Sequence, residues 1–335
     1  MKNILFYKYI AIENPEKLRD VQIKLAKSLN LLGTILIAKE GINGCVSGND
    51  SEIDKYKKTL TSDKRFSDLK FKEAEVLNHT FRKLYVRARN EIVSLKNPTD
   101  LDKKANYIEA RELKHLLDNK GDIILLDARN NYEYDIGHFK GAVHLDIDTF
   151  REFPSKIKEL PNIITAIKNK GITNNPKDNN YEGYIKNNKT NTTIKNQKKD
   201  EDFKNKKIIT YCTGGVRCEK ASALLKDAGF ENVYQLHDGI LNYGKECGDS
   251  YWEGKCFVFD TRGAIDIDPS KKSEPITQCV LCHLPSGEMH QCSYVKCDRF
   301  FTACDNCLEV LERCCSKRCR GNSIFSKISI QQIVL

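Results

Sequence analysis

One segment of the chain places a cysteine among residues that could activate it. Residues 211–220 read Tyr-Cys-Thr-Gly-Gly-Val-Arg-Cys-Glu-Lys and lie between an apolar run typical of a buried strand and a helical pattern. Adjacent glycines let the backbone curl, so that its N–H groups and the helix N-terminus point at the Cys212 sulfur. With the positive charge of Arg217, these dipoles would lower the pKa of Cys212 and make it a thiolate nucleophile. The residues of the supporting loop are Thr213, Gly214, Gly215 and Val216.

Cys218 is a second thiol close to this loop. It follows Cys212 by six residues, and the helical pattern places it in the first turn of the expected helix. It could act as a resolving thiol or redox partner of Cys212, or it could be a small residue that packs the helix against its neighbours. The sequence leaves both interpretations open.

Nine of the fourteen cysteines fall between residues 279 and 319. Cysteines two residues apart are the usual ligands of structural tetrahedral zinc, so we predict one or two zinc ions, although an iron–sulfur cluster has compatible spacing. One arrangement joins Cys279 and Cys282 to Cys304 and Cys307; another joins sequential neighbours. The predicted metal ligands are Cys279, Cys282, Cys292, Cys297, Cys304, Cys307, Cys315 and Cys319.

The charge of the chain is unevenly distributed. The 335 residues carry a formal net charge of +9, and residues 1–95 alone hold 18 basic and 12 acidic side chains, a net charge of +6. A basic surface favours anionic polymers such as RNA. Within this part Lys83, Arg87 and Arg89 alternate along one expected strand, which predicts a surface that follows the phosphates of an RNA.

The sequence gives no sign of a membrane segment or a secretory signal. No window approaches the ~18 continuous apolar residues of a membrane span. The apolar start of the chain, residues 1–12, lacks a small-residue cleavage site. Clustered cysteines in a long chain favour metal binding in a reducing compartment, so we expect a cytoplasmic protein. No protein partner is indicated.

The first part of the chain, residues 1–95, predicts a ferredoxin-like α+β domain. Its elements alternate in the approximate order strand, helix, strand, strand, helix, strand. Residues 41–44, Gly-Ile-Asn-Gly, predict a turn between two strands. Residues 91–95 are expected to extend the last strand. We expect this domain to bind RNA through its basic surface.

Two further parts follow. Residues 105–247 alternate strands and helices, which predicts a parallel, doubly wound α/β sheet with Lys207–Tyr211 as a buried strand and a helix over residues 107–117. An Asn- and Lys-rich stretch, residues 165–207, interrupts this domain and predicts a disordered insertion, because it has few apolar side chains to bury. Residues 248–335 form the predicted cysteine-rich, metal-binding tail.

The central part resembles the rhodanese family. The resemblance covers roughly residues 107–247 without the insertion, and it implies an active-site loop at residues 212–217 of a size that suits a sulfur atom rather than a phosphate. It also implies a structural polar network that supports this loop from below. The other positions that carry the resemblance are Asp127, Ala128, Arg129, Glu133 and the run at residues 137–142.

Nearly the full chain is similar to the tRNA uridine hydroxylase family of rhodanese-domain proteins. The resemblance implies an oxidoreductase that uses molecular oxygen to hydroxylate C5 of the wobble uridine at tRNA position 34. It implies the anticodon stem-loop of tRNA as partner, and it matches Cys212 to the cysteine that the family requires. The matching segments are residues 41–44, 81–93, 132–142, 150–154, 212–220 and 256–260, followed by the cysteine-rich tail.

Two chemical routes and three functions stay open from the sequence. Thiolate Cys212 could add to C6 of uracil and leave C5 nucleophilic towards dioxygen, with Arg217 and loop N–H groups stabilising the developing charge. Alternatively, Cys212 could be oxidised first and pass oxygen onward. The sequence contains no flavin, haem or NAD motif. Besides the hydroxylase, a sulfurtransferase that carries a Cys212 persulfide, possibly to tRNA, and a catalytically idle zinc-containing RNA-binding protein are compatible with these features.

Overall fold

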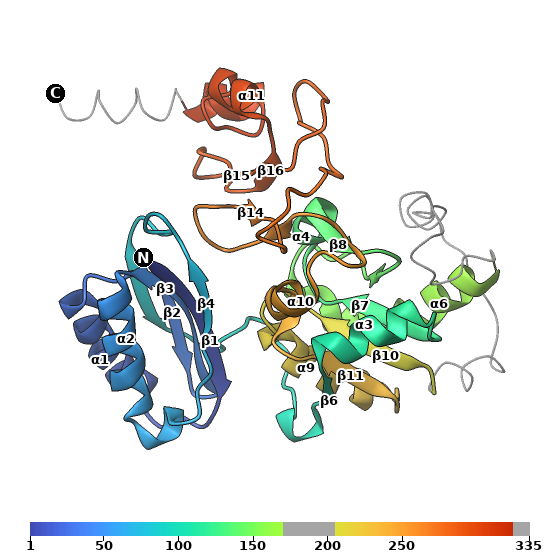
Figure 1. The fold of residues 1–335 in the computed structure, drawn as a ribbon, viewed down its shortest axis with the longest axis horizontal. Helices are drawn as coiled ribbons and strands as arrows, with labels where there is room; N and C mark the ends of the chain where they lie inside the picture. Colours follow the sequence, from blue (N-terminus) through green and yellow to red (C-terminus); the bar gives the residue numbers. More distant parts are fainter. Residues whose placement is uncertain (170–204, 324–335) are drawn as a thin grey trace.

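The computed structural model describes residues 1–169 and 205–323, and Figure 1 shows three parts in chain order. Most of the expected insertion at residues 165–207 lies outside the described residues. Along the described part of the chain, no helix combines the length and the apolar character needed to span a membrane.

The N-terminal part is a five-stranded sheet with two helices on one face (Figure 1). Its strand order is β4-β1-β3-β2-β5, in which only β5 runs parallel to its neighbour β2. The first four strands and two helices have the order of a ferredoxin-like sandwich, which confirms the predicted fold class. The elements are β1 (Lys2–Tyr9), α1 (Pro15–Ser28), β2 (Leu32–Ala38), β3 (Gly41–Gly48), α2 (Asp50–Thr61), the 3₁₀ turn η1 (Lys64–Phe66), β4 (Lys72–Glu75) and β5 (Leu84–Ala88).

Two local predictions for this part were wrong. Residues 41–44 belong to strand β3 and not to a turn. Gly44 is needed for close packing, because a Cβ atom there would lie 2.4 Å from the Phe6 ring. Residues 91–95 do not extend β5, since the Glu91 carboxylate accepts hydrogen bonds from the N–H groups of Leu95 and Lys96 and holds the segment in a bend.

The central part is a parallel sheet of order β6-β11-β10-β7-β9 with helices on both faces. Separate apolar clusters cover its two faces, as expected for a doubly wound sheet. The elements are η2 (Leu101–Lys103), β6 (Asn106–Ile108), α3 (Ala110–Asp118), β7 (Ile123–Asp127), α4 (Asn131–Ile136), β8 (Gly137–Phe139), β9 (Val143–His144), η3 (Phe150–Glu152), α5 (Phe153–Lys156), η4 (Ile157–Glu159), α6 (Leu160–Asn169), β10 (Lys207–Tyr211), α9 (Val216–Asp227), β11 (Val233–Leu236) and α10 (Gly239–Cys247).

The strand predicted at Lys207–Tyr211 is confirmed as β10. The helix predicted over residues 107–117 is wrong at its start, because Tyr107 lies in β6 and pairs with β11. The helix α3 begins only at Ala110. An edge strand of three residues is too short to show an alternating pattern in the sequence.

The C-terminal part begins against the central domain and ends in the cysteine-rich region. Strand β12 pairs with β8 of the central part, and two small hairpins follow it. Figure 1 shows the cysteine-rich end beyond the edge formed by α4 and β8. The elements are β12 (Trp252–Gly254), β13 (Cys256–Phe257), β14 (Ala264–Ile265), β15 (Met289–Gln291), β16 (Phe300–Thr302) and α11 (Asp305–Val310).

Candidate active site and metal centres

Cys212 lies at the carboxyl end of β10, in the turn that leads into α9. The turn closes because Gly215 adopts a φ of +95°, a conformation that favours glycine. The Gly215 N–H points at the Cys212 sulfur at a distance of 3.2 Å. The Cys212 residue is only 1% exposed. The structure therefore brings together the cysteine, the curled loop and the helix N-terminus that the sequence predicted.

The surroundings of Cys212 favour the thiolate. Burial by itself raises the pKa of Cys212, but the hydrogen bond from Cys218, the charge of Arg217 and the N–H groups of Arg217 and Gly215 outweigh it and lower the pKa to about 5. Cys218 shows the opposite shift: burial, its hydrogen bond to Cys212 and the Cys212 charge raise its pKa well above the ordinary value. The pair therefore consists of one thiolate and one thiol.

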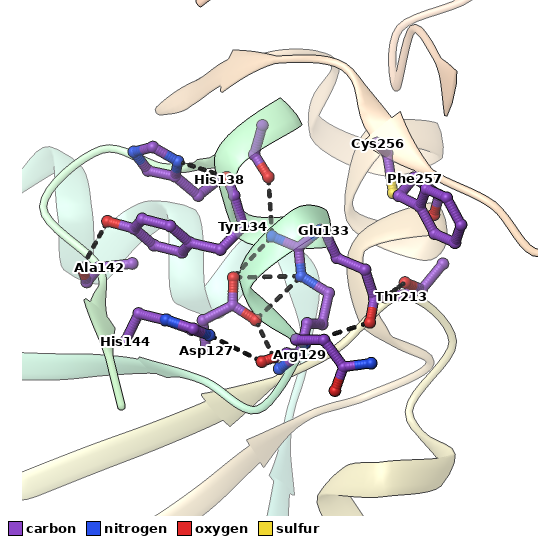
Figure 2. A network of polar contacts seen from close by, with 12 residues as sticks. Asp127, Arg129, Glu133, Tyr134, His138, Ala142, His144, Thr213, Cys256 and Phe257 are labelled. Carbon is purple, nitrogen blue, oxygen red and sulfur yellow. Dashed lines mark hydrogen bonds and ion pairs between the residues drawn. The ribbon is translucent and has the colours of Figure 1, made fainter. Parts of the chain in front are cut away.

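Arg217 is held by a buried carboxylate rather than directed freely at substrate. Its two terminal nitrogens, Nη1 and Nη2, lie 2.6 and 2.8 Å from the two oxygens of Glu133. Glu133 also accepts the N–H of Asn130, which caps the N-terminus of α4, and the Thr213 hydroxyl at 3.5 Å (Figure 2). This fork fixes the guanidinium beside Cys212 and ties the cysteine loop to α4.

A second buried ion pair lies below the first. Arg129 and Asp127 are both fully buried, with Arg129 Nη2 2.6 Å from Asp127 Oδ2. Arg129 Nη2 also donates to the Gly137 carbonyl, and His144 Nε2 lies 2.7 Å from the Arg129 carbonyl (Figure 2). These contacts join the segment after β7 to β8 and β9, near the end of the sheet that carries Cys212. The described structure thus contains the supporting polar network that the rhodanese resemblance implied.

Strand β1 of the N-terminal sheet covers the cysteine loop. Its residues alternate, so that Ile4 and Phe6 enter the core beneath the helices while Tyr7 and Tyr9 face the central domain. The Tyr9 hydroxyl donates to the Val216 carbonyl at 3.1 Å. From the sequence we expected the N-terminal part only to bind RNA, and we missed this contact. A local sequence pattern does not indicate which domain packs against the face of a strand.

Gly214 and Gly215 leave room for strand β1 because they have no side chains. A Cβ atom at Gly214 would lie 2.6 Å from Leu5 Cδ2, and one at Gly215 would lie 2.9 Å from the Tyr7 hydroxyl. These glycines therefore serve two purposes: Gly215 permits the turn, and both allow β1 to approach the backbone around Cys212.

Buried polar contacts hold the two domains together around α9. Tyr7 and Tyr107 each donate a hydroxyl to Glu219 Oε1, at 3.1 and 2.6 Å. Lys220 is 2% exposed and pairs with Glu40 at 3.0 Å and Glu91 at 2.9 Å. The helix α9, which begins at the Cys212 loop, is therefore anchored to the N-terminal domain through the consecutive charged residues Glu219 and Lys220.

The basic residues predicted for RNA lie on and beside edge strand β5. Lys83, Arg87 and Arg89 are all exposed. Between them Tyr85 is 43% exposed, and the Arg87 guanidinium lies 5.2 Å from the centre of the Tyr85 ring. Sequence reasoning missed Tyr85, although its place in the same alternation could have indicated it.

The strand register places this basic edge on the same face of the N-terminal sheet as the β1 residues that contact the Cys212 loop. Tyr85 is opposite Thr34, Thr34 is opposite Cys45, and Cys45 is opposite Leu5. Residues paired in this way share a face, and three strand spacings separate β5 from β1 by about 14 Å. The basic edge and the β1 residues that contact the Cys212 loop thus lie on the same face of the N-terminal sheet.

Phe259 is an exposed aromatic residue beside the loop. It is 58% exposed, and its ring centre lies 5.8 Å from the Arg217 guanidinium carbon. Its ring packs edge-on against Phe257, which is fully buried and contacts Tyr132. Phe257 therefore anchors the segment, and Phe259 exposes a large apolar ring to solvent beside Arg217.

The cysteine-rich tail forms two groups of four sulfur atoms, each within 4.8 Å of one another. The sulfurs of Cys282 and Cys304 are 3.8 Å apart, and those of Cys297 and Cys315 are 3.7 Å apart. Four thiolates at about 2.3 Å from a tetrahedral zinc ion would be about 3.8 Å from one another, so the spacing fits the ion. The groups are Cys279, Cys282, Cys304, Cys307 and Cys292, Cys297, Cys315, Cys319.

This grouping resolves the pairing that the sequence left open. The first CxxC pair joins the second and not its sequential neighbours, and Cys314 is the cysteine outside both groups. The apolar cluster of this region consists largely of cysteines, with few other large apolar side chains such as Phe301 and Leu308. A metal ion in each group would therefore supply much of the stability of the tail.

Comparison with known proteins agrees with the three parts. The family model of the UPF0176 acylphosphatase-like domain matches residues 1–92, that of the rhodanese-like domain matches residues 109–246, and that of the rhodanase C-terminal region matches residues 253–320. The tRNA uridine(34) hydroxylase of Cytophaga hutchinsonii is 38% identical over 95% of this chain and 89% of its own length. This chain belongs to the tRNA uridine(34) hydroxylase family.

Other members of the family are similarly close. The tRNA uridine(34) hydroxylase of Bacillus licheniformis is 37% identical over 96% of this chain and 89% of its own length. That of Enterococcus faecalis is 42% identical over 79% of this chain and 73% of its own length. The predicted family is thereby confirmed, while the individual site residues stay predictions that the geometry supports.

Proposed function

We propose that this protein hydroxylates C5 of wobble uridine 34 in tRNA, with dioxygen as co-substrate and Cys212 as the nucleophile. The observation that carries the proposal is the loop around Cys212, whose N–H groups and Arg217 lower the pKa of this cysteine. The loop lies in a chain that is related over nearly its whole length to proteins named tRNA uridine(34) hydroxylase. This activity makes the protein an oxidoreductase.

The chemistry starts from the lowered pKa of Cys212. C6 of uracil is electrophilic because it is conjugated to the C4 carbonyl, so the thiolate adds there and leaves C5 nucleophilic towards dioxygen. Backbone N–H groups from Thr213 to Arg217 stabilise the charge that develops beside the loop. Arg217, fixed by Glu133, positions this loop and keeps positive charge next to the sulfur.

The target base has an aromatic partner in Phe259. Single-stranded RNA is commonly bound by splayed bases stacked on aromatic rings, and an extruded uridine needs such a surface near the reacting sulfur. Phe259 is exposed and lies over the Arg217 guanidinium, so a uracil stacked on it would be next to the loop.

The remainder of the anticodon stem-loop would follow the basic edge of the N-terminal sheet. Lys83, Arg87 and Arg89 supply charges for phosphates, and Tyr85 supplies a second stacking surface. The face between β5 and β1 then guides the loop of the tRNA towards Cys212.

Zinc is the metal we propose for the tail, one ion for each group of four thiolates. The zinc ions would act structurally. They would hold the cysteine-rich region in place next to β13, where the rings of Phe300 and Phe257 are in contact. We also propose a cytoplasmic location, which a tRNA substrate and clustered cysteines with metal-ligand spacing favour.

The test is nucleoside mass spectrometry of tRNA from cells that lack this protein. Complementation with the wild type should restore 5-hydroxyuridine derivatives, and Cys212→Ser should not, although it accumulates to the same level and retains tRNA binding. If hydroxylation is unaffected by the deletion and a thiolated nucleoside is lost instead, the sulfurtransferase alternative replaces this proposal. If Cys212→Ser restores hydroxylation fully, the role of Cys212 is wrong.

A further inference from the structure

The loop of Cys212 contains two buried cysteines that are both hydrogen-bonded to Gly215. Cys212 is 1% exposed and Cys218 is fully buried. The N–H of Cys218 donates to the Gly215 carbonyl at 3.0 Å, which curls the first turn of α9 back over the loop. Because the Gly215 N–H donates to the Cys212 sulfur at 3.2 Å, the same residue binds both cysteines, and each of them shifts the pKa of the other.

The hydroxylation proposed above requires two electrons and two protons. One atom of dioxygen enters the C5 hydroxyl group and the other leaves as water. A pair of thiols that becomes a disulfide releases two electrons and two protons, which is the amount required. The loop therefore holds the reducing equivalents for one turnover in two cysteines that share Gly215 as a partner.

We propose that Cys218 is the resolving thiol of the hydroxylation, and that Cys212 and Cys218 together reduce the second oxygen atom. This proposal rests on the proposed function and adds the source of its electrons. The net reaction converts a C5–H bond, dioxygen and two thiols into a C5–OH bond, water and the Cys212–Cys218 disulfide.

Each step balances. Dioxygen bonds to C5 of the Cys212 adduct and takes up a proton, which gives a hydroperoxide. Loss of the C5 proton then breaks the C6–sulfur bond, so Cys212 leaves as thiolate. This thiolate attacks the distal peroxide oxygen, the O–O bond breaks, and the products are 5-hydroxyuridine and a sulfenic acid on Cys212. Cys218 sulfur attacks the sulfenic sulfur, and the displaced hydroxide leaves as water with the Cys218 proton.

The positions of the two cysteines suit these separate roles. Cys212 directly follows β10 and lies in the turn, where the loop N–H groups keep it nucleophilic. Cys218 lies on the first turn of α9 and stays protonated, so it can supply the proton that the leaving hydroxide needs. A disulfide requires the sulfurs to approach to about 2.05 Å, and the hydrogen bonds of both residues to Gly215 keep the two cysteines on one turn of the chain. An external dithiol then restores the pair.

The experiment uses the full chain, reduced and then freed of reductant without oxygen. It is mixed with an anticodon stem-loop that contains uridine 34 in oxygenated buffer. Wild type should form about one 5-hydroxyuridine per chain and then stop, with a Cys212–Cys218 disulfide in the peptide map, and dithiothreitol should restart turnover. Cys218→Ser should stop with Cys212 as a sulfenic acid that dimedone traps.

Cys256→Ser is the matched control, because Cys256 is also fully buried but lies in β13. It should form the same disulfide as wild type. If wild type makes 5-hydroxyuridine while both thiols stay free, or if Cys218→Ser turns over repeatedly without reductant, the proposal is wrong and the proposed function stands. If wild type makes no 5-hydroxyuridine, the proposed function itself fails and this inference fails with it.

Discussion

Enlarging Gly214 tests whether strand β1 packs against the catalytic loop. In Gly214→Ala the new Cβ atom would lie 2.6 Å from Leu5 Cδ2, about 1 Å closer than an ordinary carbon–carbon contact. The next nearest atom, Leu5 Cγ, is at 3.7 Å, so the overlap involves one methyl group of a flexible side chain. Overpacking of this size costs about 1–3 kcal/mol, which corresponds to a lower melting temperature by about 2–10 °C.

A double-mutant cycle makes this prediction specific. Leu5→Ala removes the methyl group in question, so Gly214→Ala should cost about 1–2 kcal/mol less in the Leu5→Ala background than in wild type. Gly321→Ala is the control, because a Cβ atom there meets no other atom within 4 Å. Thermal unfolding of all five proteins provides the measurement. Additive effects of the Leu5 and Gly214 substitutions would refute the contact between β1 and the loop.

Four further predictions follow from the site. The difference in absorbance at 240 nm between wild type and Cys212→Ser should report the Cys212 thiolate. Because the pKa of Cys212 is lowered to about 5, this signal should be present above about pH 5 and disappear as the pH falls through that value. Cys218→Ala should move the midpoint of this titration upward, because the mutation removes a hydrogen bond to the thiolate. Native mass spectrometry should find two zinc ions per chain, and Cys304→Ser should lose one. Arg87→Gln should weaken tRNA binding and reduce the slope of log affinity against log salt by about 0.7. Phe259→Ala should raise the KM for the stem-loop about tenfold, because base stacking contributes about 1–3 kcal/mol. Phe259→Tyr keeps an aromatic ring and should have a KM near that of wild type. A KM of Phe259→Ala equal to that of wild type would contradict the stacking role.

The sequence was most informative where local chemistry decides the structure. A short strand-like segment, Lys207–Tyr211, directly before Cys-Thr-Gly-Gly identified β10 and the loop that holds Cys212. The clustering of cysteines likewise predicted the eight candidate metal ligands, but only the fold showed that Cys279 lies with Cys304 and not with Cys292. Distance along the chain does not determine which thiolates meet in space.

The failures arose where tertiary contacts override local preference. Glycine is typical of turns, but Gly44 lies inside β3 because the Phe6 ring occupies the space of a side chain. Tyr107 fits a helical pattern, yet it lies in an edge strand and its hydroxyl binds Glu219. Phe259 could not be selected from sequence, because its proximity to Arg217 depends on the packing of two segments distant in the chain.

The most direct test of the central claim is the source of the oxygen atom in the product. Purified, reduced protein would be incubated with an anticodon stem-loop under ¹⁸O₂, and the nucleosides would be analysed by mass spectrometry. The account predicts that wild type yields 5-hydroxyuridine carrying ¹⁸O and that Cys212→Ser yields none. Product labelled only from H₂¹⁸O, or equal product from Cys212→Ser, would contradict it.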